Sequence, residues 1–339
     1  MGRSRTDDTF LWFRYNDSVK LIIQIPCYNE VESLPITLAD LPQQIPDISC
    51  LETMVIDDGS EDETAVIAKS LGVDYIIRHP RNLGLARAFQ TGLDNSLRLG
   101  ADIIVNTDAD NQYPGDYILD LVAPILAGKA DIVIGNRQID KITTFSPLKK
   151  MLQKLGSWTV RSVSGTAVPD APSGFRAYTR DAALRLNVLT NFSYTLDTII
   201  QAGKIGLTIL SVPVETNGPI RPSRLQTSMW HFIKAQASTI IRLYAFYEPL
   251  RTFSYIALPF ILTGIGSWLR FLYFYFVSSG NTGRIQSITI GTGLILVGVL
   301  IFLFGVQADI ASKHRQITQE TLYRLKKLEL NQQKQGVVE

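Results

Sequence analysis

The feature that most restricts how this chain can fold lies near its end. Residues 285–306 contain no charged side chain, and the run is about as long as the ~20 residues with which a helix crosses a bilayer core. A second apolar run, residues 253–277, carries one charge, Arg270, close enough to its end to reach the interface. Because the polar connection 278–284 is short, the two runs predict a hairpin of membrane-spanning helices. A buried hairpin in a soluble protein is the alternative.

Glycines and positive charges refine this prediction. Four glycines in the second run would permit close contact between the helices: Gly291, Gly293, Gly298 and Gly305. The connection holds Arg284, whereas the outer flanks carry Arg242, Arg251, Lys313, Arg315, Arg324, Lys326 and Lys327. Lys and Arg favour the cytoplasmic side of a membrane. We therefore expect an integral membrane protein whose N-terminal part and both termini are cytoplasmic.

Composition excludes some partners and compartments. A net charge of +2 gives no electrostatic reason to expect a nucleic-acid partner. Cys27 and Cys50 are too few for a disulfide framework, which favours a reducing compartment. The N-terminus contains charged residues at positions 3, 5, 7 and 8 and no apolar stretch of signal-peptide length, so we do not expect export.

Before about residue 250, short apolar runs alternate with stretches of helical periodicity. The runs that predict strands cover residues 19–25, 51–56, 75–77, 101–106 and 131–134. Strands alternating with helices predict a doubly wound, mostly parallel α/β sheet. Such sheets bind ligands beyond the carboxyl ends of their strands. Because polar clusters follow several of these runs directly, the sequence predicts one shared, nucleotide-sized site.

The cluster after the fourth run contains two carboxylates, Asp108 and Asp110, separated by Ala109. Alternate residues leaving a strand can turn toward one point, and hard oxygen donors suit Mg²⁺ or Mn²⁺. An ion held by one or two carboxylates keeps coordination sites for substrate phosphates. A solvated acidic turn is the alternative.

Asp57 and Asp58 follow the second run. A carboxylate there would accept hydrogen bonds from a base or ribose, although a capped turn would have the same sequence. Ser60 and Glu63 match a capping box for a helix over residues 61–71.

The cluster after the third run pairs a glycine with arginines. Gly84 would let the backbone approach a ligand, and Arg81 and Arg87 would meet phosphate. Neither a Gly-x-Gly-x-x-Gly fingerprint after the first strand nor a P-loop is present.

In this order and spacing the motifs resemble family 2 glycosyltransferases, which have the GT-A fold. The resemblance covers residues 19–225, and its motifs are Pro26-Cys27-Tyr28-Asn29-Glu30, Asp57-Asp58-Gly59-Ser60, Arg81-Asn82-x-Gly84-x-Ala86 and Asp108-Ala109-Asp110. Within the family the chain is similar to the polyprenyl-phosphate branch of dolichyl-phosphate mannose synthases and bactoprenol glucosyltransferases. That narrower similarity is carried by residues 108–114, Gly135-Asn136-Arg137, residues 173–178 and residues 221–225.

The resemblance implies a role for each matching residue. The nucleotide-sugar would be bound by Pro26, Tyr28, Asn29, Glu30, Asp57, Asp58, Arg81, Gly84, Asp108, Ala109, Asp110, Gln112 and Arg221. A Mg²⁺ or Mn²⁺ ion would be bound by Asp108, Asp110 and Gln112, and the lipid phosphate by Arg137, Lys150, Ser173 and Arg176. Catalysis would depend on Asp108, Asp110 and Arg137.

The resemblance implies an inverting, metal-dependent hexosyltransferase of cell-envelope glycan biosynthesis. It would move a sugar, with glucose from UDP-glucose favoured, onto undecaprenyl or dolichyl phosphate. Several alternatives stay open: transfer of mannose from GDP-mannose, transfer to a protein, diacylglycerol or polysaccharide, and a non-catalytic membrane scaffold. Whether the chain forms a homo-oligomer is also open. Gln226 and Trp230 do not form the Gln-x-x-Arg-Trp signature of processive synthases, which argues against polymer synthesis.

We therefore expect four parts: a cytosolic GT-A catalytic domain over 1–220, a juxtamembrane amphipathic helix over 221–250, two transmembrane helices over 251–306, and a solvated helical tail over 307–339. Residues 147–163 mix basic and apolar side chains, as an amphipathic helix at a membrane surface does. An ordinary surface helix is the alternative there. Asp197 is expected on a helix surface.

Overall fold

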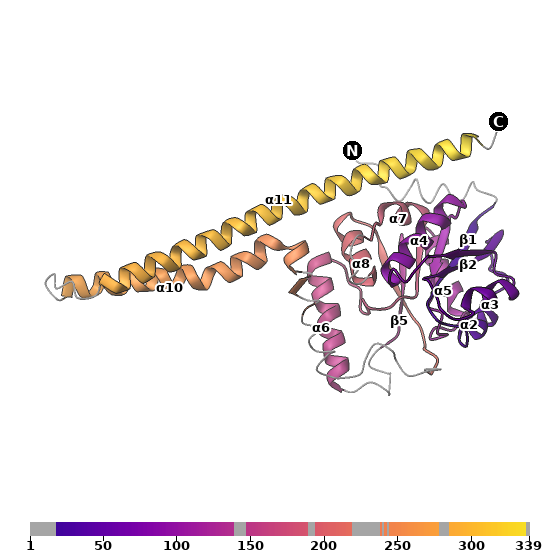
Figure 1. Ribbon diagram of the computed structural model, residues 1–339, viewed down its shortest axis with the longest axis horizontal. Coiled ribbons are helices and arrows are strands. Elements are labelled where there is room, and N and C mark those ends of the chain that lie inside the picture. Colours follow the sequence, from indigo (N-terminus) through magenta and orange to yellow (C-terminus); the bar gives the residue numbers. More distant parts are fainter. Residues whose placement is uncertain are drawn as a thin grey trace. The chain divides into compact units, whose positions relative to one another are not determined.

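The computed structural model describes residues 18–138, 147–188, 194–218, 238, 241–242, 244–277 and 285–336 (Figure 1). The chain forms two compact units. The N-terminal unit comprises Met1–Gln236 and Leu322–Glu339, and the hairpin unit comprises Ala237–Thr321. We describe each unit by itself.

A seven-stranded sheet in the order β3-β2-β1-β4-β6-β5-β7 forms the centre of the N-terminal unit. Its strands are β1 (Lys20–Cys27), β2 (Cys50–Asp57), β3 (Tyr75–Arg78), β4 (Ile103–Asn106), β5 (Ile132–Asn136), β6 (Arg176–Thr179) and β7 (Ile209–Pro213). β1 pairs in parallel with β2 and β4, β2 with β3, and β5 with β7. β6 runs antiparallel to both β4 and β5. The predicted doubly wound, mostly parallel sheet is confirmed.

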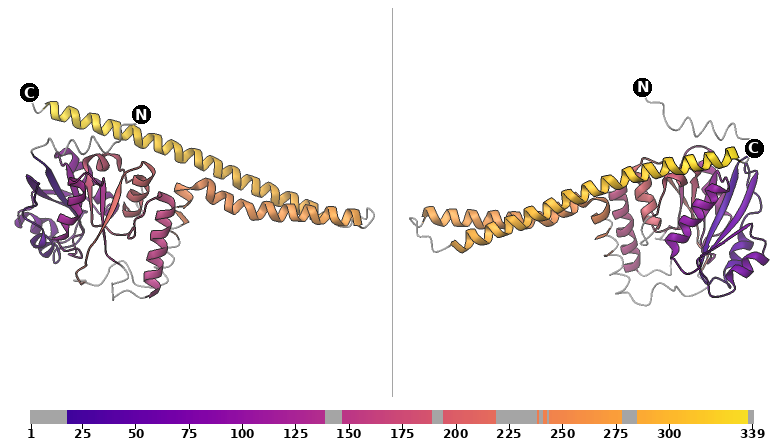
Figure 2. Two further views of the ribbon diagram at one scale, coloured as in Figure 1. Left: turned by 180° about the vertical axis from the view of Figure 1, so that it is seen from behind. Right: turned by 45° about the horizontal axis from the view of Figure 1, so that its top comes forward.

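Helices cover both faces of this sheet (Figure 2). They are α2 (Leu34–Asp40), α3 (Thr64–Ser70), α4 (Leu85–Arg98), α5 (Tyr117–Leu126), α7 (Arg180–Arg185) and α8 (Tyr194–Lys204). A further helix, α6 (Pro147–Ser164), packs against α8. Successive side chains of a strand point to opposite faces. Leu21, Ile23 and Ile25 of β1 accordingly join one core with apolar residues of α2 and α5. Gln24 points the other way, where its amide donates to the backbone oxygen of Phe89 in α4.

The predicted capping box is wrong. α3 begins at Thr64, and its N-cap residue, Glu63, makes no capping side-chain hydrogen bond. The hydroxyl of Ser60 instead accepts from the backbone N–H of Asn29, at 2.9 Å, and so joins the turn after β2 to the turn after β1. The backbone N–H of Ser60 donates to Asp57, at 2.8 Å. Ser60 therefore forms a hydrogen bond between the turns after β1 and β2, and does not cap α3.

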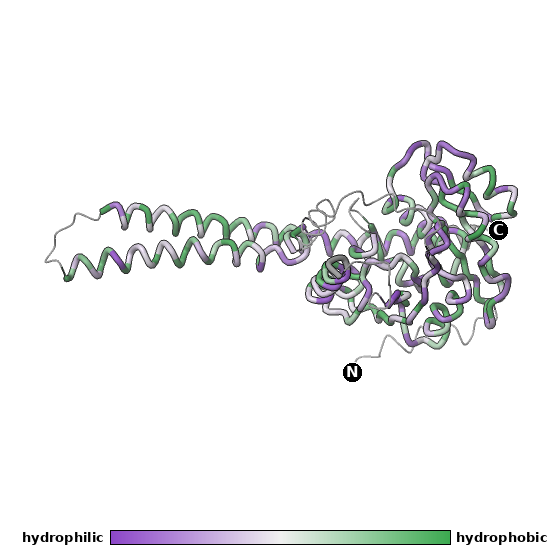
Figure 3. Tube along the Cα trace, turned by 90° about the horizontal axis from the view of Figure 1, so that it is seen from below, coloured by the Kyte–Doolittle hydropathy of each residue, from purple (hydrophilic) through white to green (hydrophobic). Residues whose placement is uncertain are grey.

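Two long helices, α10 (Pro249–Val277) and most of α11 (Ile285–Gly336), form the hairpin unit. Both are long and apolar enough to cross a membrane, and few side chains in their most apolar windows are buried. Hydrophobic positions run along both helices (Figure 3). Such a surface needs apolar surroundings, and the finding fits an integral membrane protein.

Three glycines of α11, spaced seven residues apart, let the two helices approach closely. A Cβ added to Gly298 would lie 2.5 Å from Cγ1 of Ile261, and one added to Gly291 or Gly305 would lie 2.7 Å from a side-chain atom of α10. A seven-residue repeat keeps one seam of a helix against its partner. Gly293 lies off this seam, because an added Cβ there would meet nothing within 4 Å.

The tail does not form a separate solvated helix. α11 continues without a break to Gly336, and residues from Leu322 onward belong to the N-terminal unit. There the hydroxyl of Tyr323 donates to Asp181 of α7 at 2.8 Å, and the guanidinium of Arg185 lies 4.1 Å from the ring centroid of Tyr323. Lys326 pairs with Asp94 of α4 at 2.7 Å. The expected amphipathic helix over 221–250 falls largely outside the described residues.

Candidate functional site

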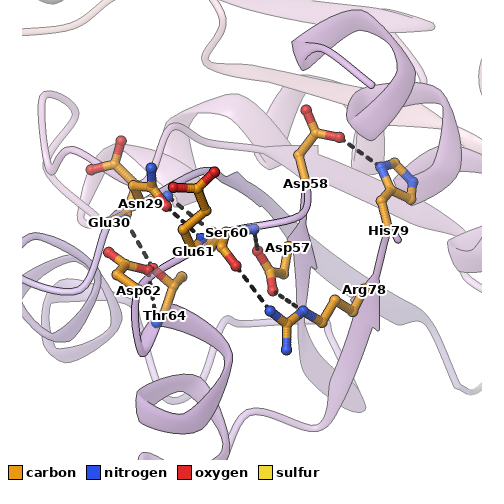
Figure 4. A network of polar contacts seen from close by, with 10 residues as sticks. All are labelled: Asn29, Glu30, Asp57, Asp58, Ser60, Glu61, Asp62, Thr64, Arg78 and His79. Carbon is orange, nitrogen blue, oxygen red and sulfur yellow. Dashed lines mark hydrogen bonds and ion pairs between the residues drawn. The ribbon is translucent and has the colours of Figure 1, made fainter. Parts of the chain in front are cut away.

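The turns that follow β1 and β2 are joined by a network of polar contacts (Figure 4). Asn29 has a left-handed φ of 54°, and its side-chain oxygen accepts from the backbone N–H of Glu61 at 2.9 Å. The backbone N–H of Glu30 donates to the hydroxyl of Thr64 at 2.9 Å, and the Glu30 carboxylate accepts from Ser33 at 2.6 Å. Of the predicted residues here, Pro26 is buried and Tyr28 is half-buried. Hydrogen bonds therefore hold the turn after β1 against the turn after β2.

Asp57, predicted to bind the nucleotide, is fully buried beneath these turns. Its carboxylate accepts from the backbone N–H of Ser60 and forms an ion pair of 3.1 Å with Arg78 (Figure 4). Arg78 also donates to the backbone oxygen of Ser60 at 2.9 Å. These contacts give Asp57 a part in holding the turn, and its placement does not support direct contact with a nucleotide.

Asp58, the next residue, fixes the loop that carries the predicted phosphate contacts. Its carboxylate accepts from the backbone N–H groups of Leu83 and Gly84, at 2.9 and 2.8 Å. Nδ1 of His79 lies 2.7 Å from the same carboxylate (Figure 4). Gly84 adopts a φ of 93°, which favours glycine. Arg81, in the same loop, is exposed to solvent.

Sequence reasoning missed His79. It follows β3 directly, its side chain is 9% exposed, and its Nε2 lies 3.0 Å from the hydroxyl of Thr91 in α4. The sequence does not reveal this contact, because Asp58 and His79 are separated by 21 positions in the chain. The parallel pairing of β2 with β3 is what brings them together.

Asp108 and Asp110 lie just beyond the end of β4. Burial first, and the charge of Asp110 second, raise the pKa of Asp108 to about 7, while Arg137 and Arg176 oppose that shift. The backbone N–H of Gln112 donates to the Asp110 carboxylate at 3.1 Å. A Cβ added to Gly174 would lie 3.0 Å from Oδ2 of Asp108, so the segment before β6 packs closely against this carboxylate.

These carboxylates fit a divalent cation that is shared with a substrate. Two neighbouring carboxylates, one of them with a raised pKa, are a pair that a bound cation would stabilise in the ionised form. Within the part of the chain that the structure describes, no group of three or more His, Cys, Asp or Glu side chains could hold a metal ion. Oxygens of a diphosphate would supply further ligands to an ion held by two carboxylates.

Arg137 follows β5 and forms a two-pronged ion pair with Asp170. Its Nε and Nη2 donate to the two carboxylate oxygens, each at 2.8 Å, and its backbone N–H donates to Oδ2 at 3.1 Å. The pair lies near enough to the Asp-x-Asp motif for the charge of Arg137 to lower the pKa of Asp108, against the larger effect of burial. Asp170 was not singled out from the sequence.

The predicted acceptor-phosphate residue Arg176 occupies a different environment from the expected one. Its guanidinium is fully buried and donates to the backbone oxygens of Ala171, Ser173 and Thr195, at 2.7 to 2.8 Å, and to the hydroxyl of Thr198. This placement does not support direct contact between Arg176 and the lipid phosphate, because the guanidinium holds together the backbone around β6.

The remaining predicted residues divide between described and undescribed parts of the chain. Ser173 is fully buried, and Lys150 is half-buried on α6. Arg221 lies outside the described residues. Asp197, expected on a helix surface, is buried in α8.

Comparison with known proteins finds similarity to glycosyltransferases. Residues 22–186 match the model of the family described as glycosyl transferase family 2. The undecaprenyl-phosphate mannosyltransferase of Micrococcus luteus is 28% identical over 206 residues, which are 58% of this chain and 83% of that protein. The UDP-N-acetylglucosamine–dolichyl-phosphate N-acetylglucosaminyltransferase of Methanococcus voltae is 31% identical over 216 residues, 57% of this chain and 83% of that protein.

A similar fold occurs in a solved structure. Glucosyl-3-phosphoglycerate synthase from Mycobacterium tuberculosis, crystallised with Mn²⁺, UDP-glucose and phosphoglyceric acid, superposes with a TM-score of 0.53 at 17% identity. The superposition covers 72% of this chain and 84% of that one. At this level of identity the likeness shows the GT-A fold alone.

Proposed function

The chain belongs to glycosyl transferase family 2, and on that premise we propose that it transfers a sugar from a nucleotide diphosphate to the phosphate of a polyprenyl lipid. Two relatives are named for transfer to undecaprenyl phosphate and to dolichyl phosphate. One observation carries the proposal: an arginine, Arg137, is fixed by Asp170 close enough to Asp108 for its charge to act on that carboxylate. That arrangement provides for two anionic groups, a diphosphate and an acceptor phosphate.

In this mechanism the protein positions two substrates and stabilises the leaving group. A divalent cation bound at Asp108 and Asp110 would neutralise the charge that develops on the departing diphosphate. An oxygen of the lipid phosphate attacks the anomeric carbon opposite the diphosphate. The new bond to the lipid phosphate forms as the bond to the nucleotide diphosphate breaks, so that the configuration inverts.

The acceptor needs orientation more than deprotonation. A phosphate monoester has a second pKa of ~6, so it is mostly dianionic at pH 7. We therefore assign no general base and give Arg137 the role of holding the attacking phosphate. The turns after β1 and β2 would bind the nucleoside, with Asp58 and Gly84 shaping the loop that faces it.

The proposal also names the sugar donor. We infer UDP-glucose from the similarity of the paired helices and of residues 221–225 to bactoprenol glucosyltransferases. The two relatives named above transfer mannose and N-acetylglucosamine, so those sugars are the alternatives to compare directly.

Placement at a membrane supports this choice of acceptor. The two long apolar helices would anchor the protein, with the N-terminal unit and both termini cytoplasmic. α6 exposes Met151, Leu155 and Trp158, and Lys150 and Lys154 lie on the same helix. Apolar and basic side chains together suit a helix that lies against an anionic membrane surface.

The test uses the full chain purified in detergent. It is mixed with undecaprenyl phosphate, Mn²⁺ and radiolabelled UDP-glucose, UDP-N-acetylglucosamine or GDP-mannose, and the lipid is extracted and counted. We expect label in the lipid from one donor, loss of label in Asp110→Ala, and retained label in the exposed control Asp120→Ala. No lipid label from any donor, together with transfer to another acceptor, would overturn the proposal.

A further inference from the structure

Asp170 is a buried carboxylate to which the proposed mechanism assigns no role. It lies between α6 and β6 and is fully buried. Its two oxygens accept three hydrogen bonds from a single residue, Arg137, from Nε, Nη2 and the backbone N–H. Burying an ion pair costs desolvation energy that the attraction between the charges often fails to recover. Stability alone therefore does not account for this buried pair.

The pair determines the direction of the Arg137 side chain. A guanidinium bound through two nitrogens to one carboxylate has a fixed plane. Nη1 is the third nitrogen of that guanidinium, and among the described residues it has no hydrogen-bond partner in the structure. The Arg137 side chain is 9% exposed, so the N–H groups of Nη1 have largely enclosed surroundings. The charge of Arg137 acts on Asp108, whose pKa it lowers against the larger effect of burial.

A purely structural explanation for the pair is weak, because the same segment is already held from another side. Arg176 donates to the backbone oxygens of Ala171 and Ser173, which lie one and three residues beyond Asp170. The backbone beyond Asp170 therefore has hydrogen-bond partners besides the Asp170–Arg137 pair.

We propose that Asp170 is a positioning residue, which fixes Arg137 so that Nη1 donates to the acceptor phosphate. This inference rests on the proposed function, and it adds a residue to it. Asp170 does not touch the substrate in this proposal. Its effect on the reaction passes entirely through the orientation of Arg137.

The experiment measures acceptor and donor kinetics separately in the full-length protein. We expect Asp170→Asn to raise the KM for undecaprenyl phosphate by about tenfold, which corresponds to one charge-assisted hydrogen bond, while the KM for the donor stays within about twofold. Asp170→Glu should recover part of the loss. Arg137→Gln combined with Asp170→Asn should bind acceptor no worse than Arg137→Gln alone, because the two residues act as one unit.

A matched control separates positioning from loss of stability. Asp102 is also buried, but it precedes β4, at the opposite end of that strand from Asp108, and accepts from the backbone N–H of Lys20 at 2.9 Å. Asp102→Asn should lower the unfolding temperature without changing the acceptor KM. If Asp170→Asn does not fold, the double variant, which removes both charges, provides the comparison with Arg137→Gln.

The outcomes distinguish this inference from the proposed function. Wild-type protein that labels no polyprenyl phosphate overturns the function, and the inference with it. Wild-type activity together with an unchanged acceptor KM in Asp170→Asn overturns the inference alone, as do additive effects in the double variant. An equal rise in donor and acceptor KM would likewise show that Asp170 acts on the whole fold.

Discussion

The imidazole of His79 lies against the carboxylate of Asp58, with 2.7 Å between Nδ1 and Oδ1, and its other ring nitrogen lies 3.0 Å from the hydroxyl of Thr91. This contact links the end of β2 to the middle of α4. Because Asp58 also accepts from Leu83 and Gly84, His79 helps to set the loop at the entrance to α4. In the proposed function that loop faces the nucleotide.

We therefore predict that His79→Ala weakens donor binding. Loss of one buried hydrogen bond to a carboxylate costs about 1.5–3 kcal/mol, some of which should appear as a roughly tenfold higher Kd for the donor nucleotide. Isothermal titration calorimetry with UDP and GDP would measure it. His314→Ala, at an exposed position in the hairpin unit, is the matched control. Equal affinities in wild type and His79→Ala would show that Asp58 is held well enough without the imidazole.

The stability of the metal-free protein should fall as the pH rises from about 4 to about 7. Burial and Asp110 raise the pKa of Asp108 to about 7, from an ordinary value of 3.8. Over that range the folded protein keeps a proton that the unfolded chain has released, so rising pH favours unfolding. Asp108→Asn cannot ionise and should lose less stability.

Thermal unfolding in EDTA at several pH values would measure this difference. The wild-type melting temperature should fall by several degrees more than that of Asp108→Asn between pH 4 and pH 7. Parallel curves for the two proteins would contradict the prediction.

The seven-residue glycine seam predicts a difference between two substitutions in one helix. Gly298→Leu should force α10 and α11 apart, because even a Cβ there would lie 2.5 Å from Ile261. Gly293→Leu adds the same side chain where nothing lies within 4 Å and should be tolerated. The fraction of protein that survives heating in mild detergent, followed by size-exclusion chromatography, would report the difference. Similar losses in both variants would argue against this seam.

The packed tail predicts a stability effect far from the candidate site. Tyr323 is 9% exposed and contacts both Asp181 and Arg185 of α7. Tyr323→Ala should cost about 2–4 kcal/mol, whereas Leu328→Ala, at a position that is 59% exposed, should cost little. Hydrogen exchange of α7 should rise in Tyr323→Ala and not in Leu328→Ala. Unchanged protection of α7 in both variants would mean that the tail contact contributes no stability.

The sequence predicts those parts of the fold that local patterns determine. Five apolar runs gave five strands, and polar residues directly after them gathered at one sheet edge, because parallel strands end on the same side. β6 and β7 were not predicted, and β6 is a short strand that begins with a buried arginine. Arg176 can be buried there only because backbone oxygens supplied by several segments surround it.

Long-range partners explain the other differences. His79 is separated from Asp58 by 21 positions, and Asp170 from Arg137 by 33. Neither separation follows a helical or strand period, so no local pattern links the members of each pair. In both Arg176 and Asp57, a charged residue of a recognised motif bonds the backbone around the site.

The docking of Tyr323 on α7 also makes the N-terminal unit discontinuous in the chain, with its last helical segment encoded after both long helices. During synthesis the ribosome therefore completes α4 and α7 well before it makes the residues that cover them. A chain that terminates early, anywhere in the hairpin, leaves Asp94 and Asp181 without their lysine and tyrosine partners. The N-terminal unit can therefore complete its packing only after both apolar helices have been translated.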